Sequence, residues 1–161
     1  MTRRLKAFLS LLIALLLLLL IALAGRLFWR GAQSEKPGEI TQVTRQTAND
    51  CDLNKAPCRV ELPGGGVLTA ELAPRPLVVL QPLTARLTLQ DIPAESAQLT
   101  FFGIDMDMPF DPTPLQEIAP GQFIGQVSLP VCVTGPMRWR AEFSIIRQRR
   151  QRIIEFLFYS Q

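Results

Sequence analysis

Three methionines and one cysteine lie late in the chain, at positions where they could hold a soft metal ion. Met106 and Met108 are two residues apart, and Cys132 and Met137 follow in a second segment. Thioether and thiolate sulfurs are the ligands that select Cu(I) in proteins. On an extended strand Met106 and Met108 would point to the same side, as a shared ion requires. The sequence therefore suggests a Cu(I) site built from Met106, Met108 and one or both of Cys132 and Met137.

Acidic residues surround the first two of these methionines. Asp105 and Asp107 alternate with them, and the span from Asp91 to Met137 contains six acidic residues and no basic one. Carboxylates favour a loop in contact with water, and they would make the approach to a bound cation electronegative. We therefore expect Asp105 and Asp107 to line the approach to the metal.

Two other interpretations of the same residues remain open. Methionine commonly fills irregular gaps in an apolar core, and an unpaired cysteine is usually a small buried residue, so the sulfur side chains could serve packing. The carboxylates of Asp105, Asp107 and Asp111 could instead bind calcium, although the segment lacks the loop glycine and the distal glutamate of an EF-hand. Copper, packing and calcium predict different responses to added metal.

The chain contains no histidine, and this excludes several classes of site. A Ser-His-Asp or Cys-His nucleophilic centre, a histidine general base, and zinc or blue-copper sites built on imidazole all need that side chain. The sequence also lacks a CxxC redox pair and a glycine-rich phosphate loop that opens a helix. We therefore expect a binding or accessory protein rather than an enzyme.

The N-terminal thirty residues are dominated by an apolar run from Ala7 to Gly25, interrupted by Ser10. About 20 apolar residues in a helix span the roughly 30 Å hydrocarbon core of a bilayer. Basic residues precede the run, so the positive-inside rule favours a cytoplasmic N-terminus. Cleavage after Ala24 is the alternative, but the run is longer than the apolar region of a signal peptide. Residues 1–30 are thus predicted as a cytoplasmic stub and a transmembrane signal-anchor helix.

Residues 31–50 are polar and lack apolar periodicity, so they are predicted as a tether, and residues 51–161 as the folded domain. Prolines recur in the first part of that domain, which excludes long helices, and several segments alternate apolar and polar residues. The pattern predicts an all-β fold, an immunoglobulin-like antiparallel β-sandwich that ends in a hairpin. The expected strands are 59–62, 67–72, 77–80, 84–90, 97–104, 122–129, 137–146 and 152–159.

An extracytoplasmic domain can hold disulfides, and the chain has three cysteines. Cys51 and Cys58 are the expected pair, which leaves Cys132 over. Closing so small a loop would stabilise the fold by about 2–3 kcal/mol on the loop-entropy model.

Basic residues are concentrated at two places in the chain. Five of the 17 flank the apolar run, and from Gly31 onward 12 basic residues stand against 14 acidic ones. This balance gives no electrostatic support to nucleic-acid binding. Arg147, Arg149, Arg150 and Arg152 lie at the tip of the predicted hairpin. They could contact anionic lipid or an acidic partner, or form a solvated loop that protects the sheet edge.

The Asp-Met-Asp-Met run in segment 103–109 and the Cys/Met strand in segment 129–140 resemble bacterial membrane-anchored periplasmic β-sandwich proteins of the YtkA-like and FixH-like kind. The resemblance covers residues 58–159. It implies copper handling or cytochrome oxidase assembly by a single-pass protein of the bacterial inner membrane, with its C-terminal domain in the periplasm. A respiratory oxidase would be the partner complex. The alternative is a structural module that docks on a membrane complex through its sheet edge and basic hairpin, without metal.

Overall fold

The computed structural model describes residues 13, 15–20, 40–130 and 137–160, and the chain divides into two units, residues 1–39 and 40–161. In the first unit Ile13 and residues 15–20 are helical, and their apolar side chains are exposed. Among the described residues, no helix is both long enough and apolar enough to cross a membrane. Most of the predicted signal-anchor and Cys132 lie outside the described residues.

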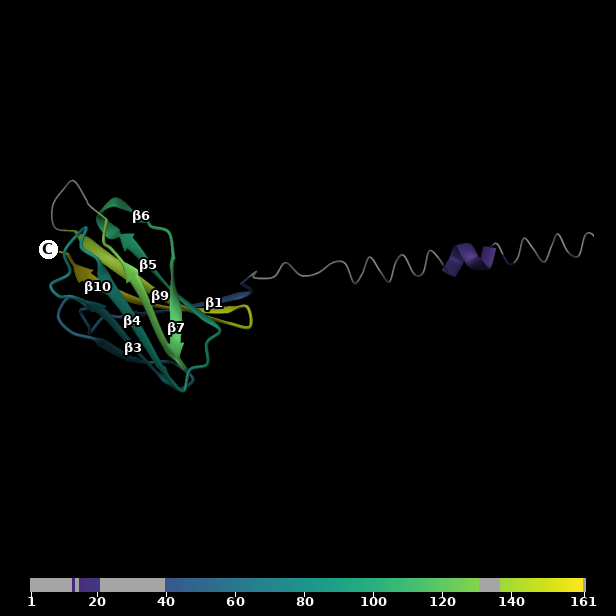
Figure 1. The fold of residues 1–161 in the computed structure, drawn as a ribbon, viewed down its shortest axis with the longest axis horizontal. Helices are drawn as coiled ribbons and strands as arrows, with labels where there is room; N and C mark the ends of the chain where they lie inside the picture. Colours follow the sequence, from purple (N-terminus) through teal and green to yellow (C-terminus); the bar gives the residue numbers. More distant parts are fainter. Residues whose placement is uncertain (1–12, 14, 21–39, 131–136, 161) are drawn as a thin grey trace, which may run out of the picture. The chain divides into compact units, whose positions relative to one another are not determined.

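The second unit is all-β, as predicted (Figure 1). The described strands form one ten-stranded sheet in the order β1-β10-β9-β5-β7-β8-β4-β3-β2, with the short β6 paired to β5. Neighbouring strands are antiparallel except β1 and β10, which are parallel. In chain order the elements are β1 Gln42–Ala48, β2 Cys58–Glu61, β3 Val67–Ala73, β4 Leu83–Gln90, β5 Ser96–Gly103, the 3₁₀ helix η1 Ile104–Met106, β6 Met108–Pro109, β7 Thr113–Ala119, β8 Gln122–Val127, β9 Arg138–Arg147 and β10 Arg150–Tyr159.

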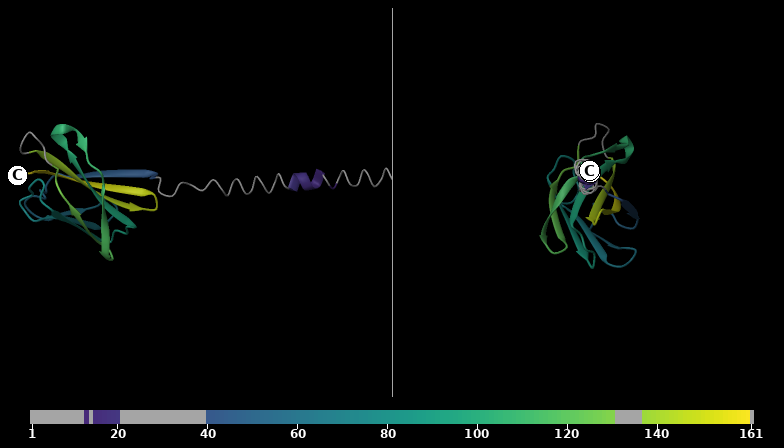
Figure 2. Two further views of the ribbon diagram at one scale, coloured as in Figure 1. Left: turned by 45° about the horizontal axis from the view of Figure 1, so that its top comes forward. Right: turned by 90° about the vertical axis from the view of Figure 1, so that its right-hand side faces the viewer.

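Strand β7 makes the sheet continuous where the prediction named two separate sheets. Its first residues, 113–115, pair with β5, and its later residues pair with β8 across a register shift between Glu117 and Ala119. The strands of this unit are therefore arranged around a shared interior (Figure 2), in a nearly barrel-shaped sheet. The two edge strands, β1 and β2, also lie close together. Nε2 of Gln46 on β1 donates a hydrogen bond to the carbonyl oxygen of Glu61 on β2 at 3.2 Å.

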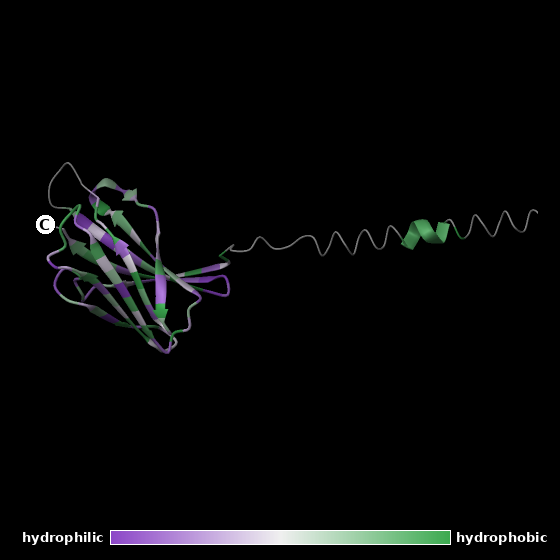
Figure 3. Ribbon diagram, viewed as in Figure 1, coloured by the Kyte–Doolittle hydropathy of each residue, from purple (hydrophilic) through white to green (hydrophobic). Residues whose placement is uncertain are grey.

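The interior is filled by one apolar core to which both halves of the sheet contribute. Polar and apolar residues alternate along the strands (Figure 3), as expected where one face of a strand is buried. On β9 the predicted inward row is confirmed, since Trp139, Ala141, Phe143 and Ile145 are all buried. The predicted disulfide between Cys51 and Cys58 is also present, and it links the loop after β1 to the start of β2.

One predicted strand is absent from the structure, and one strand of the structure was not predicted. Residues 77–80 do not form a strand, because Pro74, Pro76 and Pro82 around them cannot donate to a ladder. The polar segment 113–119, which lacks clear alternation, forms β7 because it bridges the two halves of the sheet.

Two segments predicted to be irregular are instead ordered strand. Residues 42–48, assigned to the polar tether, form β1 and pair along their whole length with β10. The hairpin predicted to end in a basic loop at 147–152 has a two-residue turn, Gln148–Arg149, between β9 and β10. Both turn residues have positive φ, 47° and 65°, as the tight turns that match strand twist require.

Candidate functional site

The predicted Cu(I) ligands that the structure describes lie at one end of β5 and β9. Met106 ends η1, which follows β5 directly, and Met108 begins β6, which pairs back onto β5. Asp107 between them adopts a left-handed conformation, with φ 49°. The prediction of one extended strand through Met106 and Met108 is therefore wrong, because the chain turns at the residue between them.

Met137 reaches the same place from the other side. Its side chain packs against Gly103, where an added Cβ would lie 2.9 Å from Cε and 3.6 Å from Sδ of Met137. The same Cβ would lie 3.8 Å from the carbonyl oxygen of Met108. A side chain at position 103 would therefore displace the end of the Met137 side chain from beside the β5 and β6 pair. Met106 and Met108 thus follow the end of β5 in the chain, and Met137 packs against its last residue, Gly103.

These methionines differ sharply in exposure. Met108 is 45% exposed, Met106 is partly buried against the core, and Met137 is 1% exposed. A solvent-borne ion would therefore meet Met108 first. Cys132 is five residues before Met137 in the sequence and lies outside the described residues.

Asp105 links residues 104–108, which we call the methionine turn, to the start of β9. The backbone N–H of Arg138 donates to Oδ2 of Asp105 at 2.9 Å, and Nε of Arg138 donates to Oδ1 at 2.8 Å. The guanidinium also forms an ion pair with the carboxylate at 2.7 Å. These hydrogen bonds, the backbone one first, hold the pKa of Asp105 below its ordinary value. Asp105 is therefore engaged by an arginine, whereas Asp107 is exposed beside the turn.

A pH dependence follows from this contact. A carboxyl whose pKa is lowered by folding stabilises the native state above its unfolded pKa, and loses that contribution as the pH falls through the folded value. We expect the melting temperature of the wild type to exceed that of Asp105→Asn at pH 7. The difference should shrink as the pH falls below the ordinary value of 3.8. Thermal melts from pH 7 to pH 2 measure it, and a difference that does not change with pH would contradict the assignment.

Aromatic rings pack behind the methionine turn. Trp139 contacts Phe101 edge-on at 6.3 Å between ring centroids, and Phe110 at 5.8 Å. The Trp139 side chain is fully buried, and its Nε1 has no hydrogen-bond acceptor among the described residues. The aromatic cluster therefore joins β5, β9 and the residue after β6, and the Asp105–Arg138 pair ties the turn to β9.

Carboxylates do not gather into a hard-metal site in the part of the chain that the structure describes. There, no group of three or more Cys, Asp or Glu side chains is placed to hold one ion. Asp105, one of the three candidates for calcium, is bound to Arg138. The Asp105 carboxylate is therefore already engaged by an arginine.

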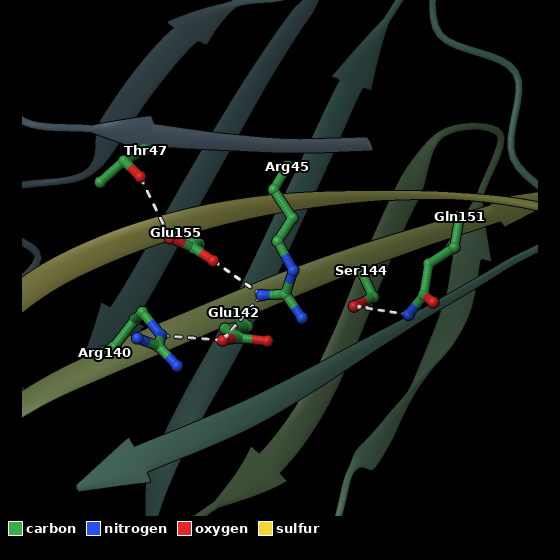
Figure 4. Close-up of polar contacts among 7 residues, drawn as sticks. All are labelled: Arg45, Thr47, Arg140, Glu142, Ser144, Gln151 and Glu155. Carbon is green, nitrogen blue, oxygen red and sulfur yellow. Dashed lines mark hydrogen bonds and ion pairs between the residues drawn. The ribbon is translucent and has the colours of Figure 1, made fainter. Parts of the chain in front are cut away.

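Sequence reasoning missed a charged cluster on the outer face of β1, β10 and β9 (Figure 4). Arg45 donates through Nη1 to Oε1 of Glu155 at 2.7 Å and to Oε1 of Glu142 at 3.1 Å, while Arg140 also donates to Glu142 at 2.8 Å. Glu142 and Glu155 are cross-strand partners, so their charges would repel each other without these arginines. Thr47 adds a hydrogen bond to Glu155 at 3.0 Å. This cluster explains why β1 docks on β10.

Replacing Arg45 with methionine should loosen β1. Glu142 and Glu155 have side chains only 12% and 14% exposed, so their charges are poorly solvated without Arg45. Because Arg45 itself is half exposed, screening limits the loss in unfolding free energy to about 1 kcal/mol. Urea denaturation measures it, and hydrogen exchange should accelerate in β1 before the other strands. Arg86→Met, at an exposed position of β4, is the control. Unchanged exchange in β1 would contradict this account.

The four predicted partner-contact arginines divide into two groups. Arg147, Arg150 and Arg152 line a cavity of about 370 Å³ at the hairpin end of the sheet. Arg149 occupies the turn, where its carbonyl oxygen accepts hydrogen bonds from N and Oγ1 of Thr41 at 2.8 and 3.2 Å. The arginines therefore belong to a different end of the domain from the methionines, because β9 carries Arg147 and Arg138 at its opposite ends.

Comparison with known protein families, curated proteins and solved structures found no match to this chain.

Proposed function

We propose that the chain is a membrane-anchored, extracytoplasmic, non-catalytic accessory protein that binds Cu(I). Met106, Met108 and Cys132 would be its principal ligands, and the buried Met137 would be a further one. The anchor is the apolar run of residues 7–25, and the domain is immunoglobulin-like in type, facing the periplasm of a bacterial inner membrane. Its resemblance to oxidase-associated proteins makes a respiratory oxidase the proposed partner.

One observation supports this proposal more than any other. The contact between Asp105 and Arg138 fixes the turn that carries Met106 against the residue that follows Met137. Met106, Met108 and Met137, from two segments distant in the sequence, would supply three soft sulfur donors near the end of β5. Thioether and thiolate donors favour Cu(I) over hard divalent ions, and such a site needs no histidine.

A competition titration tests the proposal. The full chain in detergent micelles would be mixed with Cu(I) and a colorimetric Cu(I) chelator under reducing agent mild enough to leave the disulfide intact. We expect one equivalent of Cu(I) to be withdrawn from the chelator. Met108→Leu should weaken binding at least about tenfold, and Cys132→Ser should abolish competition.

Met108 is the informative position because its side chain is exposed. Met108→Leu should leave the melting temperature unchanged, so that any loss of copper reports a lost ligand rather than unfolding. Ile118→Leu, at a position 55% exposed on β7, is the matched control and should keep full affinity. A wild-type chain that takes no copper from the chelator would end the proposal.

The burial of Met137 favours a second candidate, a metal-free interaction module in which the methionines only pack. Met137 is 1% exposed, as a core residue would be. In that case copper variants would leave the cellular phenotype intact, and charge reversal at Arg149 and Arg150 would abolish association with the membrane complex.

A further inference from the structure

Three arginines of the hairpin, Arg147, Arg150 and Arg152, occupy positions in the inward-facing rows of β9 and β10. On β9 the buried row Trp139, Ala141, Phe143 and Ile145 continues in register to Arg147, and on β10 the row Ile154, Phe156 and Phe158 continues backward to Arg152 and Arg150. The cross-strand pairs agree, since Arg147 is opposite Arg150 and Ile145 is opposite Arg152. The apolar interior thus changes to an arginine-lined mouth at one end.

This mouth is a cavity rather than a flat surface. Its volume is about 370 Å³, within the range of small-ligand sites. Gln42 and Thr44 of β1 continue the arginine side of the wall, and the turn at Gly64 and Gly65 and the loop at 91–93 form the facing side. A solvated loop that merely protects a sheet edge would not enclose such a volume.

The charge in the mouth is not neutralised by the described part of the protein. Among the described residues, Arg147, Arg150 and Arg152 form no ion pair. Asp91 lines the same cavity, and Glu95 accepts a hydrogen bond from the backbone N–H of Gln148 at 3.1 Å. The three arginines that line the cavity therefore outnumber the two carboxylates at this end. The net charge of these groups is therefore positive. The planar guanidinium group of arginine donates paired hydrogen bonds to the oxygens of a phosphate group.

The polypeptide enters the domain at this same end. Thr41, just before β1, is hydrogen-bonded to the carbonyl oxygen of Arg149 in the hairpin turn, and β1 lies beside the β9–β10 hairpin (Figure 1). Only nine residues, 31–39, separate the predicted anchor segment from Ile40. Nine residues span at most about 32 Å when fully extended. A linker of this length would allow the arginine-lined mouth of an anchored chain to reach the headgroups.

We infer that this mouth binds the phosphate of an anionic phospholipid headgroup, with Arg147, Arg150 and Arg152 as its ligands. The inference is independent of copper and rests on the membrane anchor of the proposed function. Headgroup binding would fix the orientation of the domain on the membrane, with the methionine turn at the opposite end of β9 directed away from the bilayer.

Hydrogen exchange on the full chain in nanodiscs tests the inference. One set of discs contains phosphatidylcholine, and the other contains phosphatidylcholine with phosphatidylglycerol. We expect the backbone amides of residues 148–152 to exchange at least about threefold more slowly in the anionic discs, and the ratio to fall with added salt. Arg147→Gln, Arg150→Gln and Arg152→Gln together should bring the ratio to one. Arg59→Gln with Arg86→Gln, at exposed positions elsewhere in the sheet, should leave it unchanged.

Each other outcome is decisive. Equal exchange in both discs would overturn the inference. Inorganic phosphate that protects the same amides of the chain in neutral detergent, without an effect of phosphatidylglycerol, would assign the site to a soluble anion and overturn the lipid. A chain that does not remain with the discs during gel filtration would show that the proposed anchor is wrong. A chain that remains without protection would refute only the headgroup site.

Discussion

Replacing Trp139 with alanine should lower the free energy of unfolding by about 3–5 kcal/mol. The side chain is fully buried, it contacts Phe101 and Phe110, and it belongs to the cluster that supports the methionine turn. Its removal leaves a large cavity where the ends of β5 and β9 meet. Urea denaturation at pH 7 measures the loss, and it should exceed the losses caused by Arg45→Met and by Asp105→Asn.

A phenylalanine at the same position should cost much less. Trp139→Phe keeps most of the apolar contact and also removes the buried Nε1, which has no acceptor among the described residues. We expect a loss below about 2 kcal/mol. Tyr159→Ala, at a position 62% exposed, is the control and should change stability little. A loss below about 1 kcal/mol for the alanine variant would mean that Trp139 does not occupy the core.

Removing the disulfide should lower the free energy of unfolding by about 2–3 kcal/mol, from the entropy that the closed loop takes from the unfolded chain. The double variant Cys51→Ala with Cys58→Ala removes the disulfide without introducing a charged or polar side chain. The bond joins the segments that carry the two edge strands, β1 and β2. Hydrogen exchange should therefore accelerate most in these two strands.

The wild type under reducing conditions provides the comparison for the double variant. Both should unfold at the same urea concentration, because neither has the covalent link. A double variant as stable as the oxidised wild type would contradict the proposed role of the bond. Uniform acceleration of exchange through all strands would contradict its role at the edges.

Much of the fold was predictable because strand periodicity is a local property. The alternation in residues 137–146 is strict, and it predicted both β9 and the buried position of Trp139. The close spacing of Cys51 and Cys58 predicted the disulfide correctly. Strand β1 could not be found in this way, because it is polar on its outer face and is held by Arg45 through Glu142 and Glu155, which are distant in the sequence.

The candidate site was predictable in composition but not in geometry. Sulfur side chains at 106, 108, 132 and 137 suggest a soft-metal site, which stays a prediction, and the turn at Asp107 with its Asp105–Arg138 contact is revealed by no local pattern. The arginine-lined mouth was missed for a related reason. Arginines at a hairpin tip predict a solvated loop. Only the pairing register of β9 and β10 shows that Arg150 and Arg152 belong to the inward-facing row of β10.

Copper X-ray absorption on the Cu(I)-loaded full chain tests the central claim most directly. The account predicts sulfur as the principal scatterer around the ion, with fewer sulfur neighbours in Met108→Leu and in Cys132→Ser. A first shell made only of nitrogen and oxygen would contradict it, because the proposed ligands are all sulfur atoms.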